Sequence, residues 1–220
     1  ENLARRASRA VARVKCRAPG KGDRTLPPGM LELLIVPTAL DALEAGDLSK
    51  LQIDQALRQT VVNYLDRYRL LTTTLQVREP TYLGVKVYAE IVPDEYSPPD
   101  IVRARVIDSL RKLITPLAPG DEGQVSGEGP AWEGWPFGRD LYVAEIYSLI
   151  QAVPGVKHVL EVRLSQRQVI PSKESLPRAE EGQPEAAAEE SLTPVTGRRL
   201  EVPDDTLLCS LDHEVELVAL

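Results

Sequence analysis

Few residues of this chain combine in a spacing that could carry out chemistry. Cys209, His213 and Glu214 lie close together in the sequence and are side-chain types that bind metals. A zinc site takes about four ligands, however, and the whole chain has only two cysteines and two histidines. His213-Glu214 also lacks the second histidine of a metalloprotease helix. A strand-edge histidine beside a small buried thiol is the favoured interpretation, and we expect no metal and no cofactor.

Motifs for phosphate binding and nucleophilic catalysis are also incomplete. The Gly-Lys-Gly at residues 20–22 lies in a loop near a strand but lacks the rest of the phosphate-cradling pattern G-x-x-x-x-G-K-[ST]. His158 falls within an alternating strand, and neither histidine follows a nucleophile motif. Asp204 and Asp205 could be paired carboxylates, but directly after a proline they are more simply turn formers. The sequence therefore predicts a protein that is not an enzyme.

Composition and charge limit the classes of partner. The chain has 220 residues, 43% of them hydrophobic and 27% charged, which is ordinary for a soluble globular protein. A formal charge of −7 argues against a general nucleic-acid binder. Two cysteines far apart in the sequence favour reduced thiols in a protein synthesised in the cytoplasm. We see no secretory signal, and the longest apolar run, at 33–40, is too short to insert into a membrane.

An aromatic segment is the best candidate for a binding surface. Trp132, Trp135 and Phe137 are both of the tryptophans and the only phenylalanine of the chain, and they fall within six residues of one another, interleaved with Gly and Pro. Exposed aromatics near an arginine are common anchors of protein–protein contacts. We expect an interface formed by Trp132, Trp135, Phe137, Arg139 and Tyr142. The alternative is that the rings fold back and cover their own sheet.

The elements that would position these residues begin with an α+β pattern over residues 1–80. The apolar periodicity is helical in some segments and alternating in others. Ser49 with Gln52 three residues later is a capping-box signature, and the apolar residues behind it predict a helix of about five turns. The expected elements, in order, are a helix at 2–10, strands at 11–18 and 30–37, a helix from 49 to 71 that includes Tyr68 and Leu71 in its apolar stripe, and a strand at 73–79.

The pattern starts again after Pro80. Residues 83–91 alternate without a slip, which is the clearest strand signal in the chain. Ser97 followed by two prolines marks the start of a helix that runs to about residue 117. A second helix is predicted by one apolar stripe at helical spacing, formed by Tyr142, Ile146, Leu149, Ile150 and Val153. It ends at Pro154-Gly155, because proline cannot continue a helix and glycine accepts the turn beyond it. A strand then begins at Val156.

These elements predict the α+β class, with two ferredoxin-like or split βαβ sandwich domains. The first domain covers 1–80; because the chain starts at Glu1, partway into a helix, we expect it to be truncated and to lack its opening strand. The second covers 81–168 and carries the Trp-rich arm at 130–141. Residues 169–199 are rich in Pro, Glu, Ala and Ser and are expected to be a flexible, disordered acidic linker. Residues 200–220 form a C-terminal β segment, expected to be a short hairpin.

Several motifs together resemble the baseplate J-like family, the baseplate wedge proteins of contractile phage tails and contractile injection systems. The resemblance covers most of residues 1–168 and the last twenty or so. It is carried by Gly134-Trp-Pro-Phe-Gly-Arg139, Leu141-Tyr142-Val143, Glu145-Ile146-Tyr147 and Val153-Pro-Gly-Val156, and by the earlier Ala12-Arg-Val-Lys-Cys16 and Pro80-Thr-Tyr82.

The resemblance implies an assembly role without catalysis. Members of this family join in wedges around a six-fold hub and link the hub to the sheath. The expected partners are therefore other baseplate wedge subunits, a second copy of the chain, and hub and sheath proteins, with no nucleic acid. The expected location is a phage tail or contractile injection particle.

Two other functions remain open on the sequence alone. A ferredoxin-like pair could be a small-molecule-binding regulatory module, because such sheets often hold ligands between them. An acylphosphatase-like enzyme would need an asparagine on a strand beside an anion-binding loop. The only asparagines, Asn2 and Asn63, fall on predicted helices, which makes this the weakest of the three hypotheses.

Overall fold

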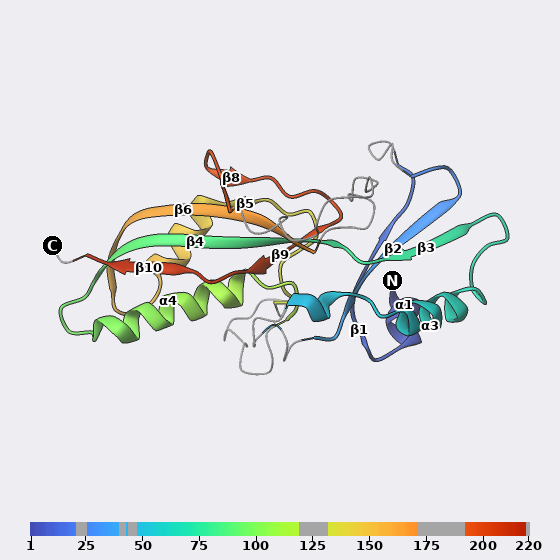
Figure 1. Cartoon of the computed structure of the whole chain (residues 1–220), viewed down its shortest axis with the longest axis horizontal. Helices are drawn as coiled ribbons and strands as arrows, with labels where there is room; N and C mark the ends of the chain where they lie inside the picture. Colours follow the sequence, from blue (N-terminus) through green and yellow to red (C-terminus); the bar gives the residue numbers. More distant parts are fainter. Residues whose placement is uncertain (21–25, 40–42, 44–47, 119–131, 171–191, 219–220) are drawn as a thin grey trace, which may run out of the picture. The chain divides into compact units, whose positions relative to one another are not determined.

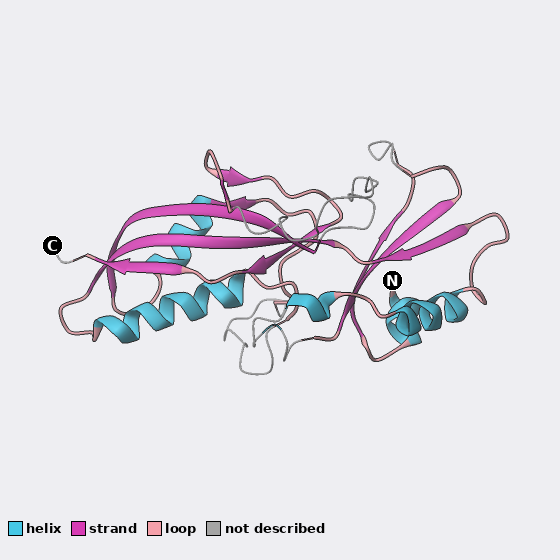
Figure 2. Cartoon of the chain, in the orientation of Figure 1, coloured by secondary structure: helices cyan, strands magenta, loops and turns pink. Residues whose placement is uncertain are grey.

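The structure is a computed structural model, and it describes residues 1–20, 26–39, 43, 48–118, 132–170 and 192–218. The chain divides into two compact units, Glu1–Thr81 and Tyr82–Leu220. Each unit combines helices with its own sheet (Figure 2), so the α+β class expected from the sequence is confirmed. The boundary between the two units follows Thr81, next to Pro80, where the sequence pattern restarts.

The first unit is built on a three-stranded sheet of mixed direction (Figure 1). The middle strand β2 pairs antiparallel with β1 on one side and parallel with β3 on the other. A parallel pair needs a crossover connection, which here contains the helix α3. The elements of this unit are α1 (Asn2–Ala7), β1 (Val11–Arg17), β2 (Met30–Pro37), the 3-10 turn η1 (Leu48–Leu51), α3 (Gln55–Leu65) and β3 (Thr74–Arg78).

One face of this sheet and the two helices enclose a core of aliphatic side chains. Period-two alternation places Leu33 and Ile35 of β2 on the same face, while Val61 and Leu65 lie four residues apart on α3. Burying a large aliphatic side chain contributes about 1.5–3 kcal/mol, so these contacts hold the helices to the sheet. The core consists of Ala4, Val11, Val14, Leu33, Ile35, Ile53, Val61, Leu65 and Val77.

The helix predicted from 49 to 71 is shorter than expected at both ends. Residues 48–51 form the 3-10 turn, and α3 begins only at Gln55 with Asp54 as its N-cap. After Leu65 the chain turns, and Arg69 fixes the turn by donating hydrogen bonds to the Asp66 carboxylate (2.6 Å) and the Thr73 carbonyl (3.1 Å). Tyr68 and Leu71, predicted to be on the apolar stripe, are therefore exposed, Leu71 completely.

The second unit has a sheet built on two long antiparallel strands, β4 (Thr81–Pro93) and β6 (Val156–Ile170) (Figure 1). The strand order is β10-β4-β6-β7, and β9 also pairs with β4. A separate two-stranded ribbon joins β5 to β8. The remaining bounds are β5 (Leu141–Tyr142), β7 (Thr193–Pro194), β8 (Arg199–Leu200), β9 (Thr206–Ser210) and β10 (Glu214–Leu217).

Two helices, α4 (Pro99–Leu113) and α5 (Val143–Gln151), pack on this sheet. Val102, Val106 and Leu110 recur every four residues on α4 and are fully buried, as the helical pattern predicts. They meet the inward side chains of β4, which are Val85, Val87, Ala89 and Ile91 and are also fully buried.

The C-terminal segment is not the hairpin expected from its alternating pattern. Its strands β9 and β10 each pair with β4, and β10 runs parallel to it, so the described part of this segment, residues 200–218, belongs to the compact second unit. An isolated hairpin is marginal in water, whereas pairing with a long buried strand satisfies the same backbone groups and buries Leu207, Leu208 and Val215.

The segment 169–199, predicted to be a flexible linker, forms β structure at both of its ends. β6 continues to Ile170, and Thr193–Pro194 pairs with Ser165 and Gln166 of β6. Arg199 lies in β8. Residues 171–191, which carry most of the acidic run, lie outside the described residues.

The two ferredoxin-like domains are not confirmed. The first unit has the element order helix, strand, strand, helix, strand that the sequence predicts. A split βαβ unit, however, has another strand between its two parallel strands, whereas β2 and β3 pair directly.

Among the described residues, none of the helices is long and apolar enough to cross a membrane.

Candidate functional site

The Trp-rich arm is fastened to the second unit through Trp135. The Trp135 ring is fully buried in the core, and its indole N–H donates a hydrogen bond to the Arg139 carbonyl at 2.9 Å. Its backbone N–H donates to the Thr115 carbonyl at 2.6 Å. Trp132 packs edge-on against it, with ring centroids 6.2 Å apart. For Trp135 the structure therefore supports the alternative in which the ring covers its own sheet, because a fully buried ring has no surface left for a partner.

Two glycines allow the arm to lie this close. Gly134 has φ +91°, and a Cβ there would lie 2.8 Å from backbone atoms of Leu117. Gly138 has φ +66°, and its Cβ would lie 2.8 Å from Cα of Asp204. Both positions combine a left-handed backbone with a close approach, which only glycine accommodates without strain. The Gly-Trp-Pro-Phe-Gly run is thus a packing motif.

Other residues of the predicted interface remain accessible. Tyr142 is exposed by 43% and lies at the N-cap of α5. Arg139 is also exposed; its guanidinium lies 4.8 Å from the Trp135 ring centroid and 2.5 Å from Glu145 Oε1. Phe137 and Trp132 are half-buried. That these four residues contact a partner stays a prediction. Trp135 lies in the core beside them and holds the arm in place.

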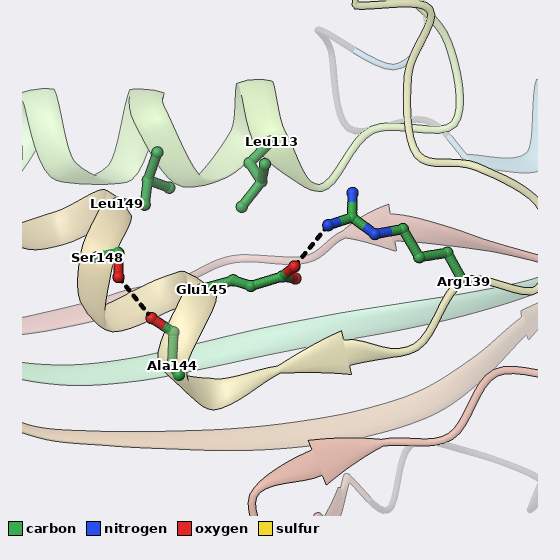
Figure 3. Close-up of a pocket in the computed structure, with 6 residues that line it drawn as sticks. All are labelled: Leu113, Arg139, Ala144, Glu145, Ser148 and Leu149. Carbon is green, nitrogen blue, oxygen red and sulfur yellow. Dashed lines mark hydrogen bonds and ion pairs between the residues drawn. The ribbon is translucent and has the colours of Figure 1, made fainter.

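An open pocket of about 510 Å³ lies beside this arm (Figure 3). Its floor comes from α5, its far wall from Leu113 of α4, and the Arg139–Glu145 ion pair spans one end. The Ser148 hydroxyl donates a hydrogen bond to the Ala144 carbonyl of the same helix at 3.0 Å. The Arg139 guanidinium pairs with Glu145 Oε1, whereas the buried Glu145 Oε2 has no hydrogen-bond partner among the described residues. The rest of the lining is mainly apolar, which is typical of a packing or binding surface. The pocket residues are Leu113, Arg139, Ala144, Glu145, Ser148 and Leu149.

The candidate metal ligands Cys209, His213 and Glu214 do not converge on one point. Cys209 is completely buried, and burial raises the pKa of its thiol. His213 uses both ring nitrogens within the protein, with Nδ1 3.1 Å from the Val87 amide and Nε2 2.8 Å from the Ser210 hydroxyl. Glu214 faces solvent and pairs with Lys86 at 3.0 Å. In the part of the chain that the structure describes, no group of three or more His, Cys, Asp or Glu side chains could hold a metal ion.

The remaining motif candidates are equally dispersed. His158 is exposed on β6, opposite Val92 of β4. Asp204 and Asp205 lie in the turn before β9, where Asp204 contacts Gly138 of the arm. Of the Gly-Lys-Gly at 20–22, only Gly20 is within the described residues.

Sequence reasoning missed a buried ion cluster in the first unit. Glu32 of β2 is 4% exposed and accepts hydrogen bonds from Arg17 of β1 at 2.7 Å and Arg78 of β3 at 2.5 Å. The three strands are thus linked by one carboxylate between two guanidinium groups. The available signal was that Glu32 is the one charged residue in an otherwise apolar strand.

The fold and the site define an α+β protein in which Trp135 and the two glycines of the arm serve packing. No protein-family model matches the sequence, and no curated protein matches it significantly. Among solved structures, the chain is similar to a chain of the anti-feeding prophage (AFP) baseplate, determined by cryo-EM and 6-fold symmetrised, with a TM-score of 0.56 and 12% sequence identity. The match covers 98% of this chain and 36% of that chain, so this chain spans about a third of the length of its structural neighbour. At this identity the likeness shows a shared fold.

Proposed function

We propose that this chain is a structural component of the baseplate of a contractile phage tail or contractile injection system. The observation that carries the proposal is the extent of the structural similarity, which covers 98% of the chain against a chain from a baseplate. The J-like motifs at 134–156 support the finer assignment to the wedge, with a place between hub, neighbouring wedges and sheath. The role would be assembly without catalysis.

Exposed apolar side chains support an assembly role. Soluble monomers seldom expose clustered large apolar residues unless another surface covers them. In the first unit Tyr68, Leu70 and Leu71 are exposed together in the turn after α3. Among the described residues of the second unit, the exposed large apolar side chains are those of Tyr96, Ile101, Tyr142, Leu160 and Leu192.

The proposed partners are other wedge subunits, a second copy of this chain, and hub and sheath proteins in a six-fold particle. The mechanism would be mechanical. The long antiparallel pairing of β4 with β6 would make the sheet of the second unit resist shear. In the first unit, the buried ion pairs of Glu32 would fix the register of the strands. Stiff units of this kind could hold neighbours in place and transmit a change in wedge contacts to the sheath.

The proposal is tested in particles from the native source. We would delete the gene, complement it with tagged wild-type protein or with a Leu70→Ser/Leu71→Ser variant, and image the particles by negative stain. Deletion should abolish complete particles, and the tag should label the baseplate end. Complete particles after deletion, or neighbouring reading frames without sheath, tube and spike genes, would contradict the proposal.

The regulatory-module alternative makes a different prediction. A small ligand that binds the folded chain should raise its melting temperature in a concentration-dependent manner. The open pocket beside α5, with a single ion pair at one end, offers few polar groups to fix such a ligand. A specific, saturable rise in melting temperature with nucleotides, amino acids or metals would favour the alternative over the baseplate role.

A further inference from the structure

His213 fastens the C-terminal segment to the central strand of the second unit. It lies between β9 and β10, is 8% exposed, and accepts a hydrogen bond at Nδ1 from the Val87 N–H of β4 at 3.1 Å. Its Nε2 lies 2.8 Å from Ser210 Oγ. One imidazole thus joins β4 to the end of β9.

The hydrogen-bond partners fix where the ring proton lies. The Val87 amide can only donate, so Nδ1 must be unprotonated, and a neutral imidazole then carries its proton on Nε2. That N–H donates to the Ser210 oxygen, and the Ser210 hydroxyl donates onward to the Leu211 carbonyl at 3.2 Å. Each polar group in this series of hydrogen bonds, from the Val87 N–H to the Leu211 carbonyl, therefore has a partner only while His213 is neutral.

The charged groups around the ring oppose a second proton. Lys86 of β4 and Arg111 of α4 both disfavour the imidazolium, whereas Asp212 favours it. Asp212 already pairs with Arg111 at 3.5 Å, and Glu214 with Lys86 at 3.0 Å. Burial above all, followed by Arg111, lowers the pKa of His213 from 6.5 to about 4.

We propose that His213 is an acid-sensitive latch that holds β9 and β10 against β4. Protonation of Nδ1 would place two N–H donors, those of the ring and of Val87, head to head in a buried site. The bond that joins the segment to β4 would then become repulsive. This inference does not depend on the baseplate role.

Opening the latch would change what the second unit can bind. The segment occupies an edge of β4, where Leu211 N–H donates to the Val85 carbonyl at 3.0 Å and Val218 N–H to the Ile91 carbonyl at 2.9 Å. Once the segment leaves, these carbonyls and the Val87 amide would be unpaired. A strand edge of this kind accepts an extended segment from another chain.

The direction and size of the pH effect follow from linkage. The open segment binds a proton with the ordinary histidine pKa of 6.5, and the closed segment with a pKa of about 4, so the open form gains protons first as pH falls. The latch is therefore fully effective above pH ~6.5 and weakens progressively toward pH ~4. Between pH 7 and pH 5 the open population should rise by about 20-fold.

Cys209 provides a direct readout because its thiol is completely buried in β9. We would measure its labelling by 4,4′-dithiodipyridine in the full chain, with peptide mapping to separate it from Cys16. Cys16 is half-buried in the first unit and corrects for the reagent's own pH dependence. When closing is faster than labelling, the Cys209 rate relative to the Cys16 rate follows the open population. That ratio should rise by about 20-fold from pH 7 to pH 5.

The matched variants are His213→Asn and His158→Gln. Asparagine can place its carbonyl oxygen near the Nδ1 position and accept from Val87, but it does not titrate, so the rise should disappear. His158 is exposed, and its replacement should leave the rise unchanged. If His213→Asn does not fold, the wild-type imidazole titration, followed by ¹⁵N NMR, replaces it, and its midpoint must coincide with the Cys209 transition.

Three results would overturn the latch. The first is a Cys209 to Cys16 labelling ratio that does not change from pH 7 to pH 5. The second is an equal rise in His213→Asn. The third is an NMR titration that shows the proton of the neutral ring on Nδ1, because that tautomer cannot accept from Val87.

Discussion

The indole N–H of Trp135 donates a hydrogen bond to the Arg139 carbonyl at 2.9 Å, and the Arg139 guanidinium lies 4.8 Å from the centroid of the same ring. The buried ring thus positions an exposed cation on the surface. Trp135 therefore packs beneath the predicted interface, and the contact with a partner would fall to the accessible residues Trp132, Phe137, Arg139 and Tyr142.

Trp135→Ala should destabilise the second unit by about 3–5 kcal/mol, because it removes a fully buried aromatic side chain. Urea unfolding followed by Trp132 fluorescence measures the change. Tyr142→Ala is the matched comparison, because Tyr142 is 43% exposed and its truncation removes less buried surface, so it should cost clearly less than that of Trp135. Equal losses in the free energy of unfolding would contradict the conclusion that Trp135 belongs to the core and Tyr142 to the surface.

Gly155→Ala should destabilise the second unit through both its backbone and its surroundings. Gly155 has φ +99°, and a Cβ there would lie 2.7 Å from Val102 Cγ2. We expect a loss of about 1–3 kcal/mol for the backbone alone, and more with the clash. Gly197→Ala separates the two, because Gly197 has φ +126° with no atom within 4 Å of the added Cβ. The difference between the two variants in urea unfolding measures the clash, and no difference would refute it.

Tyr147→Phe should weaken the outer edge of β6. The Tyr147 hydroxyl accepts the Val162 N–H at 3.1 Å and so takes the place of a neighbouring strand. Removing it leaves a buried donor unpaired, at a cost of about 1–3 kcal/mol. Hydrogen exchange at the Val162 amide should accelerate accordingly. Tyr96→Phe, at an almost fully exposed tyrosine, should leave that exchange unchanged; an equal effect would show that the hydroxyl does not protect the edge.

Glu32→Gln should destabilise the first unit by about 3–5 kcal/mol, because it removes the charge that two largely buried arginines share. Thermal unfolding followed by far-UV circular dichroism, with tryptophan fluorescence as the separate probe of the second unit, locates the loss. Glu161→Gln breaks an exposed pair with Arg163 and should leave the melting temperature unchanged. A loss from Glu161→Gln as large as that from Glu32→Gln would argue that burial is not the cause.

Local signals in the sequence predict the elements that depend on near neighbours. The alternation at 83–91 becomes β4, and the stop at Pro154-Gly155 ends α5 within a few residues. The same reasoning places the end of α3 too late, because Tyr68 and Leu71 continue the helical period while the Arg69 hydrogen bonds impose a turn. An apolar residue at the right spacing does not report whether a surface exists to cover it.

For the candidate site, too, the sequence identifies the residues, but only the tertiary structure shows which of them are buried. Sequence composition draws attention to Trp132, Trp135, Phe137, Arg139 and Tyr142, because aromatics are scarce elsewhere. It does not tell which ring is buried, since that depends on Leu117 and Asp204 approaching the two glycines of the arm. The Glu32 cluster is missed because its two arginines are distant in sequence and meet only across paired strands.

By itself, the sequence determined the α+β class and most helices and strands, because periodicity and turn residues act over a few positions. Only the tertiary structure decided that β2 and β3 pair directly, that β9 and β10 complete the β4 edge, and that Trp135 is core while Tyr142 is surface. These outcomes depend on contacts between residues far apart in the chain. Such contacts are selected by the total surface buried and the backbone groups satisfied, which no local pattern records.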